Sequence, residues 1–155
     1  MFGESLWGAA VMTFVTAMVP VIELRGAIPA GAAAGLPVWT ATVIAIAGNM
    51  VPIPFLLLLL RKIFAWLRRF RRLGEKIAWL ERRAHLKGRT VRKYRTLGLI
   101  ILVGIPLPGT GAWTGALVAD VLDIRMKTAL PAIFAGVCIA GILVALVTTG
   151  VVRLF

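Results

Sequence analysis

The sequence predicts an all-α integral membrane protein built from two inverted repeats, each a re-entrant helical hairpin followed by a transmembrane helix. Three observations predict this fold. Hydrophobic residues make up 60% of the 155-residue chain and its mean hydropathy is +0.94, whereas soluble domains have an apolar share of about 45–50%. The basic residues gather in one segment, and two of the apolar blocks contain prolines and glycines that would break a helix.

Four apolar blocks follow one another along the chain, and they are not equivalent. Residues 36–60 and 128–152 are each long enough to span a bilayer, which takes about 20 helical residues. Residues 6–22 run into the broken segment "VPVIELRGAIPAGAAAGLP". Residues 97–122 are interrupted at Pro106, after a stretch that reaches roughly 14 Å, about half of the bilayer core. The two broken blocks therefore predict re-entrant hairpins.

The charge distribution places one cytoplasmic segment between the two repeats. Residues 61–95 hold 14 of the 18 Lys and Arg residues, and the positive-inside rule assigns such a loop to the cytoplasm. Nucleic-acid binding is disfavoured, because no folded soluble module accompanies the charge. Apolar residues recur here at three- and four-residue spacing, which predicts a basic amphipathic helix on the anionic lipid leaflet. These apolar residues are Ile63, Trp66, Phe70, Leu73, Ile77 and Leu80.

The remaining charges set the topology of a single membrane domain over residues 1–155. A crossing by residues 97–122 would put Arg125 and Lys127 opposite the basic loop, whereas a hairpin returns them to the cytoplasm. The expected organisation is then a hairpin plus span over 1–60, a cytoplasmic loop over 61–96, and an inverted hairpin plus span over 97–155. Both termini are expected outside a bacterial inner (plasma) membrane.

Glu23 and Arg25 lie in the first broken segment and are the first candidates for a functional site. An ionisable side chain inside a membrane costs several kcal/mol and marks a functional position by default. A structural role is the alternative, in which the two pair with each other or reach the interface. A mutual pair requires non-helical backbone, because residues two apart do not face each other on a helix; Gly26 and Pro29 allow for such backbone.

The second broken segment, "GIPLPGTGAWTG", spans residues 104–115 and offers backbone groups instead of charges. Proline removes a donor and glycine permits an open backbone. The returning helix, starting near Thr110, directs free N–H groups and its positive dipole end to the tip, where they would suit an anion. Close helix packing explains the same glycines. The tip residues singled out are Pro106, Pro108, Gly109, Thr110 and Gly111.

A weak internal repeat connects the two tips. "RGAIPAGA" at 25–32 resembles "TGAWTGA" at 110–116, with one residue of slip. An inverted arrangement then places Glu23 and Arg25 opposite Pro108 and Thr110, at a midplane site of the kind found in transporters. Arg25 is expected to be the counter-ion of an anionic head group, and Glu23 a protonatable or cation-coupling group. Pro29, Trp113 and Thr114 complete the predicted site.

Enzymatic function is disfavoured, and no cofactor or metal is expected. The chain has no Ser/His/Asp set, no cluster of metal ligands and no nucleotide-type phosphate loop. Cys138 is the only cysteine and lies in an apolar run, so it forms no disulfide framework.

The motifs "ELRGAIPAG" and "PLPGTGAWTGAL" resemble those of the small multidrug export protein family, over nearly the whole chain. That family is similar to the DedA superfamily, whose members carry paired re-entrant hairpins and include flippases for a polyprenyl phosphate lipid carrier. The resemblance implies transport in which Glu23, Arg25 and the loop 106–115 are central. DedA proteins commonly have a basic residue in the second hairpin, where this chain has "LPGTG".

The sequence thus leads to three hypotheses about function. The favoured one is a homodimeric transporter that moves an amphiphilic anion, such as a lipid phosphate, with proton or ion coupling. The second is efflux of cationic or amphiphilic drugs, with Glu23 as the counter-charge. The third is a membrane scaffold whose basic helix recruits partners.

Overall fold

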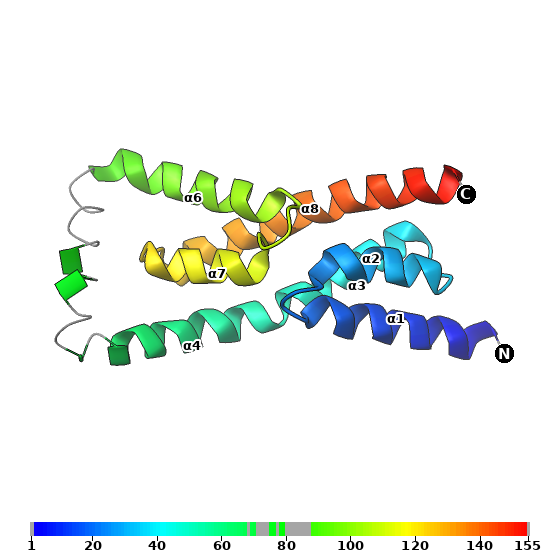
Figure 1. Ribbon diagram of the computed structural model, residues 1–155, viewed down its shortest axis with the longest axis horizontal. Helices are drawn as coiled ribbons and strands as arrows, with labels where there is room; N and C mark the ends of the chain where they lie inside the picture. Colours follow the sequence, from blue (N-terminus) through cyan, green and yellow to red (C-terminus); the bar gives the residue numbers. More distant parts are fainter. Residues whose placement is uncertain (1, 68, 71–74, 77, 80–87, 155) are drawn as a thin grey trace.

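The computed structural model describes residues 2–67, 69–70, 75–76, 78–79 and 88–154, and within these ranges the chain is helical and contains no strand. The helices lie along the long axis of an elongated molecule (Figure 1). Part of the predicted basic amphipathic helix lies outside the described residues. The helices are α1 (Phe2–Met18), α2 (Glu23–Ala33), α3 (Val38–Met50), α4 (Pro52–Leu67), α6 (Gly88–Gly104), α7 (Ala112–Val121) and α8 (Met126–Leu154).

Two helical hairpins start from opposite ends of the molecule. Figure 1 shows α1 and α2 as one hairpin and α6 and α7 as the other, with their tips near the middle of the long axis. The tips are residues 19–22 and 105–111, the connections between the helices of each pair. α8 runs along the whole molecule and contacts both hairpins. The two broken segments of the sequence are therefore brought to the same level of the structure.

Two helical stretches are long and apolar enough to cross a membrane. They are Val38–Leu67, which comprises α3 and α4, and Met126–Leu154, which is α8. The first contains a bend at Val51, where Pro52 begins α4 and has no N–H to donate to the preceding turn. This first stretch is longer than the apolar block 36–60 predicted from the sequence, since α4 ends at Leu67.

In each half of the chain, the first helix of the hairpin crosses the following long helix at a glycine. A Cβ atom on Gly48 of α3 would lie 2.4 Å from the carbonyl oxygen of Phe14 in α1. A Cβ on Gly136 of α8 would lie 2.6 Å from Cβ of Val103 in α6. These glycines permit the backbones to approach closely, as small residues do at helix contacts in membranes.

Both hairpins also end in the same kind of helix C-cap. After α2, Leu36 N–H donates to the Gly31 carbonyl at 3.0 Å, and Gly35 has φ +98°. After α7, Ile124 N–H donates to the Ala119 carbonyl at 2.8 Å, and the left-handed position is held by Asp123, with φ +52°. A residue in this conformation satisfies the last helix carbonyls, and glycine adopts it with least strain.

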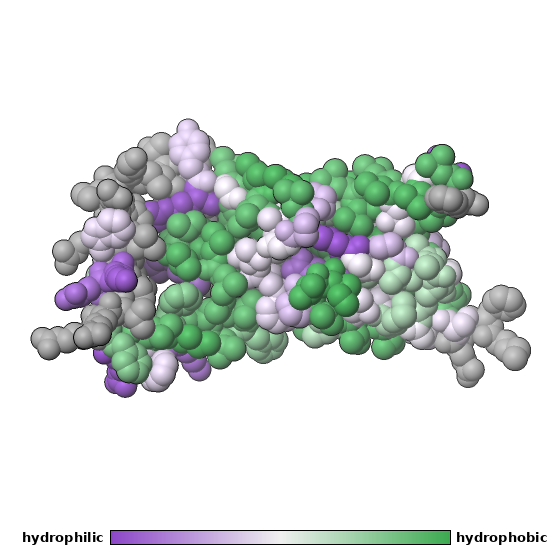
Figure 2. Space-filling model, in the orientation of Figure 1, coloured by the Kyte–Doolittle hydropathy of each residue, from purple (hydrophilic) through white to green (hydrophobic). Residues whose placement is uncertain are grey.

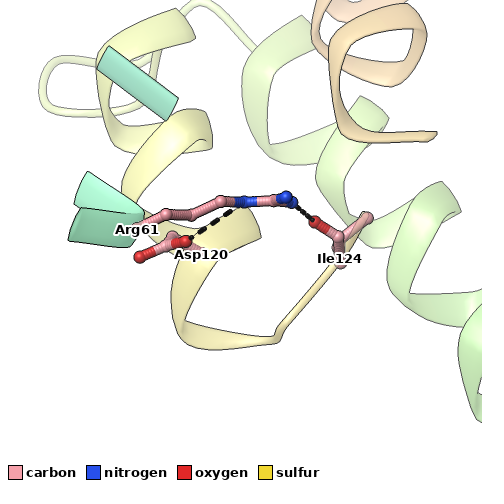
Figure 3. A network of polar contacts seen from close by, with 3 residues as sticks. All are labelled: Arg61, Asp120 and Ile124. Atoms are coloured by element: carbon pink, nitrogen blue, oxygen red, sulfur yellow. Dashed lines mark hydrogen bonds and ion pairs between the residues drawn. The ribbon is translucent and has the colours of Figure 1, made fainter. Parts of the chain in front are cut away.

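Two arginine side chains contact the second of these turns, and Figure 3 shows the contacts of one of them, Arg61. Arg61 of α4 donates to the Ile124 carbonyl at 2.8 Å, and its Nε lies 3.7 Å from Asp120 Oδ1. Arg95 of α6 donates to the Leu122 carbonyl at 3.1 Å. Cations at a helix C-terminus complement its exposed carbonyls and dipole. The end of α7 is thus joined to the two helices that lead into and out of the basic segment.

The surface between the two ends of the molecule is mostly apolar. Figure 2 shows green residues along the length, hydrophilic residues gathered at the end where α4 ends and α6 begins, and a hydrophilic spot near the middle. Large hydrophobic side chains such as Trp7, Phe55 and Val147 are more than two-thirds exposed. Contiguous apolar surface of this kind is typical of proteins that face lipid. The central hydrophilic spot lies where the two hairpin tips come together.

Candidate functional site

Glu23 is the first residue of α2, directly after the tip of the first hairpin. Its backbone has φ +49°, a conformation that costs a non-glycine residue about 1–2 kcal/mol. The residue is only 5% exposed, and its carboxylate Oε1 accepts a hydrogen bond from the backbone N–H of Trp113 at 3.4 Å. Backbone strain of this kind persists where the surrounding structure fixes it, and it is common at functional sites.

Gly111, the N-cap residue of α7, makes room for this carboxylate. A Cβ atom at Gly111 would lie 2.0 Å from Oε2 of Glu23. The backbone of Gly111 is extended, with φ −177°, so the requirement for glycine here is steric. Glu23 therefore caps the N-terminal end of α7 from the opposite hairpin, where a negative charge interacts favourably with the free N–H groups and the helix dipole.

Arg25 binds the other helix end at the tip of the second hairpin, the C-terminal end of α6. Its guanidinium donates to the Leu107 carbonyl, to the Ile105 carbonyl at 3.2 Å and to Thr110 Oγ1 at 3.1 Å. These acceptors follow the C-terminal end of α6, where unpaired carbonyls attract a cation. The two charges of the first hairpin thus bind the two opposite helix ends of the second.

The remaining residues of the predicted site divide between the interior and the surface. The Thr110 hydroxyl lies 2.8 Å from the Ile105 carbonyl and 2.9 Å from the Leu107 carbonyl, and the Thr114 hydroxyl donates to the Gly109 carbonyl at 2.8 Å. Trp113 is half-buried. Three tip residues are exposed at the turn: Pro106, Pro108 and Gly109, the last with φ +84°.

Pro29 does not join the site in this structure. It lies inside α2 with its ring exposed, and the stretch from Glu23 to Ala33 is helical throughout. The break in the first hairpin lies earlier, at residues 19–22 with Pro20. Gly26 and Pro29, which could have supplied non-helical backbone, are both part of the helix. The left-handed conformation at Glu23 supplies the local change of direction instead.

A narrow pocket, too tight to hold a water molecule, lies between the hairpins and the long helices, and its polar walls are Glu23, Arg25 and Asn49. Small and aliphatic residues from α6, α7 and α8 complete it, including Val103, Ala112 and Val137. The side chains of Glu23 and Arg25 therefore border apolar residues on this side. In such surroundings polar contacts are strong and unpaired polar groups are costly.

Several buried polar atoms in this region have no hydrogen-bond partner among the described residues. They are Nε of Arg25, Nε1 of Trp113, and both Oδ1 and Nδ2 of Asn49, a residue with 0% exposure. Each such group costs about 1–3 kcal/mol. Asn49 is absent from the site residues predicted from the sequence, since a residue just before Pro52 and Pro54 is typical of a helix kink as well. An amide within an apolar run was the signal that could have found it.

The family model described as "Putative small multi-drug export protein" matches residues 23–143. The chain belongs to this family. The match begins at Glu23 and takes in Arg25, Asn49 and the whole second hairpin. No curated protein and no solved structure matches this member of the small multi-drug export family.

Membership of the small multi-drug export family bears on both activity and location. The family's description names export, which is transport and not catalysis. Two helices of this chain are long and apolar enough to cross a membrane. An exporter family and two such helices together indicate a membrane protein.

Proposed function

We propose that this protein is a transporter that moves an amphiphilic anion through a site between two re-entrant hairpins. The observation that carries the proposal is the reach of Arg25 and Glu23 from one hairpin to the open helix ends of the other, at mid-length of the molecule. Discontinuous helices that meet near the bilayer midplane are a recurring design of transporters.

The proposed topology is an inverted repeat, and helix length supports it. α2 with 11 residues and α7 with 10 residues are each about 15–17 Å long, half of the hydrocarbon core, whereas α8 with 29 residues is about 44 Å long. The end at which α4 stops and α6 starts carries the basic segment 61–95 and is placed in the cytoplasm. Both termini are at the other end of the molecule and face outside.

The polar groups of the site favour an anionic substrate. Arg25 supplies a positive charge, and its Nε is a buried donor that finds no acceptor in the described part of the chain. A phosphate-like group supplies acceptor oxygens for such donors. Apolar walls beside the site and an apolar outer surface suit a substrate with a hydrophobic tail, such as a lipid phosphate. Glu23 is proposed as the group that couples the movement to protons or ions.

Transport in reconstituted vesicles tests the proposal. Glu23→Gln and Arg25→Ala are expected to abolish uptake of a fluorescent lipid phosphate or a comparable amphiphilic anion, while the variants still insert into the membrane. Lys62→Ala is a matched control, because Lys62 is an exposed charge on α4 at the basic end. Full activity of both site variants would reject the proposed function.

Efflux of cationic drugs is the second candidate, and the family description favours it. In that case Glu23 is the counter-charge of the drug, and Arg25 only holds the tip of the second hairpin. The two candidates differ in one measurement: removal of the positive charge in Arg25→Gln weakens binding of an anion but not of a cationic dye. Dye efflux retained in Arg25→Gln and lost in Glu23→Gln would favour this alternative.

A homodimer is part of the proposal. Two spans and two hairpins are few to enclose a path for a polar head group, and a second copy would provide further walls. Cross-linking in native membranes is expected to give a dimer that purified protein retains in native mass spectrometry. Detection of monomer alone by both methods would remove this part of the proposal and leave the site unchanged.

A further inference from the structure

The position that an anion would take at the N-terminal end of α7 is already filled by a group of the protein itself. The Glu23 carboxylate accepts the Trp113 N–H and rests against Gly111. A substrate anion that is to use the same N–H groups must displace this carboxylate. The displaced side chain then needs another partner in the same pocket, because a carboxylate left without one inside the protein is strongly unfavourable.

Asn49 is the unused polar side chain of that pocket. It is fully buried at the end of α3, it lines the pocket together with Glu23 and Gly111, and neither Oδ1 nor Nδ2 has a partner among the described residues. A side-chain amide offers one acceptor oxygen and donor hydrogens. Its natural complement is a group with one donor and one acceptor side by side.

A protonated carboxyl group is such a complement, and an ionised carboxylate is not. The protonated form has one O–H donor and one carbonyl acceptor, so it can make two parallel hydrogen bonds with an amide. The ionised form only accepts, and it would satisfy Nδ2 while facing Oδ1 with a second oxygen. Asn49 therefore distinguishes the two protonation states of a carboxyl group that reaches it.

We propose that Asn49 is the positioning residue that receives the protonated Glu23 side chain when the transported anion takes its place at α7. In this step the incoming anion brings solvent to the site, and the Glu23 carboxylate takes a proton from a solvent hydronium ion, leaves the Trp113 N–H and pairs with Asn49; on return it gives the proton back to the solvent. The inference rests on the proposed anion transport and assigns how Glu23 couples to it.

The charges of the pocket make the two events interdependent. Among the described residues that line it, Glu23 and Arg25 are the titratable groups, and the residues from α3, α6, α7 and α8 contribute none. With Glu23 ionised the pair is neutral, and with Glu23 protonated the positive charge of Arg25 is uncompensated. Protonation of Glu23 therefore favours the binding of one negative charge near Arg25, so that one proton and one anion bind together.

Infrared difference spectroscopy of the purified protein on acidification in the presence of dodecyl phosphate, an amphiphilic anion without a carbonyl group, tests the inference. The wild type is expected to gain a carboxyl C=O stretching band that is absent from Glu23→Gln. In Asn49→Leu the band is expected at higher frequency, because the hydrogen bond to the C=O group is lost. Asn49→Ser keeps one of the two hydrogen bonds, so its carboxyl band is expected at an intermediate frequency. This variant replaces Asn49→Leu if the latter does not fold.

Thr42→Val is the matched control. Thr42 is a buried polar residue of the same helix, but its hydroxyl already donates to the Val38 carbonyl at 2.8 Å and it does not line the pocket. In Thr42→Val the Glu23 carboxyl band is expected at the wild-type frequency. The inference is wrong if the Glu23 carboxyl band has the same frequency in Asn49→Leu as in the wild type. It is also wrong if the wild type shows no such band. Neither result concerns transport, which the vesicle assay of Glu23→Gln judges separately.

Discussion

The two halves of this chain share one plan and differ in what they bring to the centre. In each, a hairpin is followed by a long helix, the first hairpin helix crosses that long helix at a glycine, and the hairpin ends in a left-handed C-cap. The first half brings the charged side chains of Glu23 and Arg25, whereas the second brings free N–H groups and carbonyls.

This difference explains how two charges can be held inside an apolar protein. The backbone ends of a broken helix cannot pair with each other, and a buried charge cannot remain alone. Each half therefore supplies what the other lacks: Arg25 meets the carbonyls after α6, and Glu23 meets the first N–H groups of α7. An equal pair of tips, both charged or both uncharged, would leave these groups unsatisfied.

The largest expected effect comes from Gly111, the glycine at the tip of the second hairpin. Gly111→Ala would place Cβ 2.0 Å from Glu23 Oε2 and push the carboxylate away from the Trp113 N–H. Transport is expected to fall roughly tenfold or more, the equivalent of about 1.4 kcal/mol. Gly26→Ala, at the aligned position within α2, is the comparison: its Cβ would lie 2.3 Å from Cγ2 of Ile22, a contact that a χ1 rotation of this exposed side chain can relieve. Equal loss in both variants would contradict the assigned role of the second tip.

The two helix crossings are expected to be similarly intolerant of a methyl group. Gly48→Ala brings Cβ to 2.4 Å from the Phe14 carbonyl oxygen, and Gly136→Ala brings it to 2.6 Å from Val103 Cβ. Neither neighbour can turn away, so each change is expected to lower the free energy of unfolding by about 1–3 kcal/mol. Unfolding in mixed micelles measures this, and Gly98→Ala, where nothing lies within 4 Å, is the control.

A smaller effect is expected from the arginine contacts at the turn after α7. Arg61→Met removes the hydrogen bond to the Ile124 carbonyl and the ion pair with Asp120, and is expected to cost about 1–2 kcal/mol. The Arg61 side chain is 39% exposed, so solvent weakens the pair. Thermal unfolding of Arg61→Met beside Lys62→Met, an exposed neighbour, gives the comparison. The same melting temperature in both would show that the turn holds without Arg61.

The smallest effect is expected from exchanging the residues at the two left-handed caps. Asp123→Gly removes the strain of φ +52° and is expected to stabilise the protein by about 1 kcal/mol at most. Gly35→Asp introduces the same strain at φ +98° and, with no arginine contact found at this turn among the described residues, is expected to destabilise by a similar amount. Melting temperatures that shift in the same direction for both would contradict the equivalence of the two turns.

Much of the architecture could be predicted from local features of the sequence. Long apolar runs predicted the two stretches that are long and apolar enough to cross a membrane, and Pro20 and Pro106 to Gly109 lie at the turns of the hairpins. The family was predicted from the motifs around Glu23 and Trp113, and the match over residues 23–143 confirms it. The alignment of Arg25 with Thr110 also anticipated two residues that hydrogen-bond in the structure. Binding of a substrate at this site stays a prediction.

Other parts of the site could not be predicted, because they depend on groups far apart in the sequence. The α7 N–H groups were expected to be open for an anion, but Trp113 N–H already donates to Glu23 from 90 residues away. Asn49 was not predicted, since its sequence neighbours do not reveal that its buried amide has no hydrogen-bond partner among the described residues. Pro29 was included for its backbone, which proved helical.

The sequence by itself determined where helices run, where they break and which end of the molecule is basic, because these follow from hydropathy, proline and glycine within a few residues of each position. Only the tertiary structure decided which charge meets which helix end. That choice rests on the packing of two hairpins from opposite ends of the molecule, which brings Glu23 and Arg25 to the open backbone of residues 105–113. It also leaves Asn49 beside them with no hydrogen-bond partner in the described ranges.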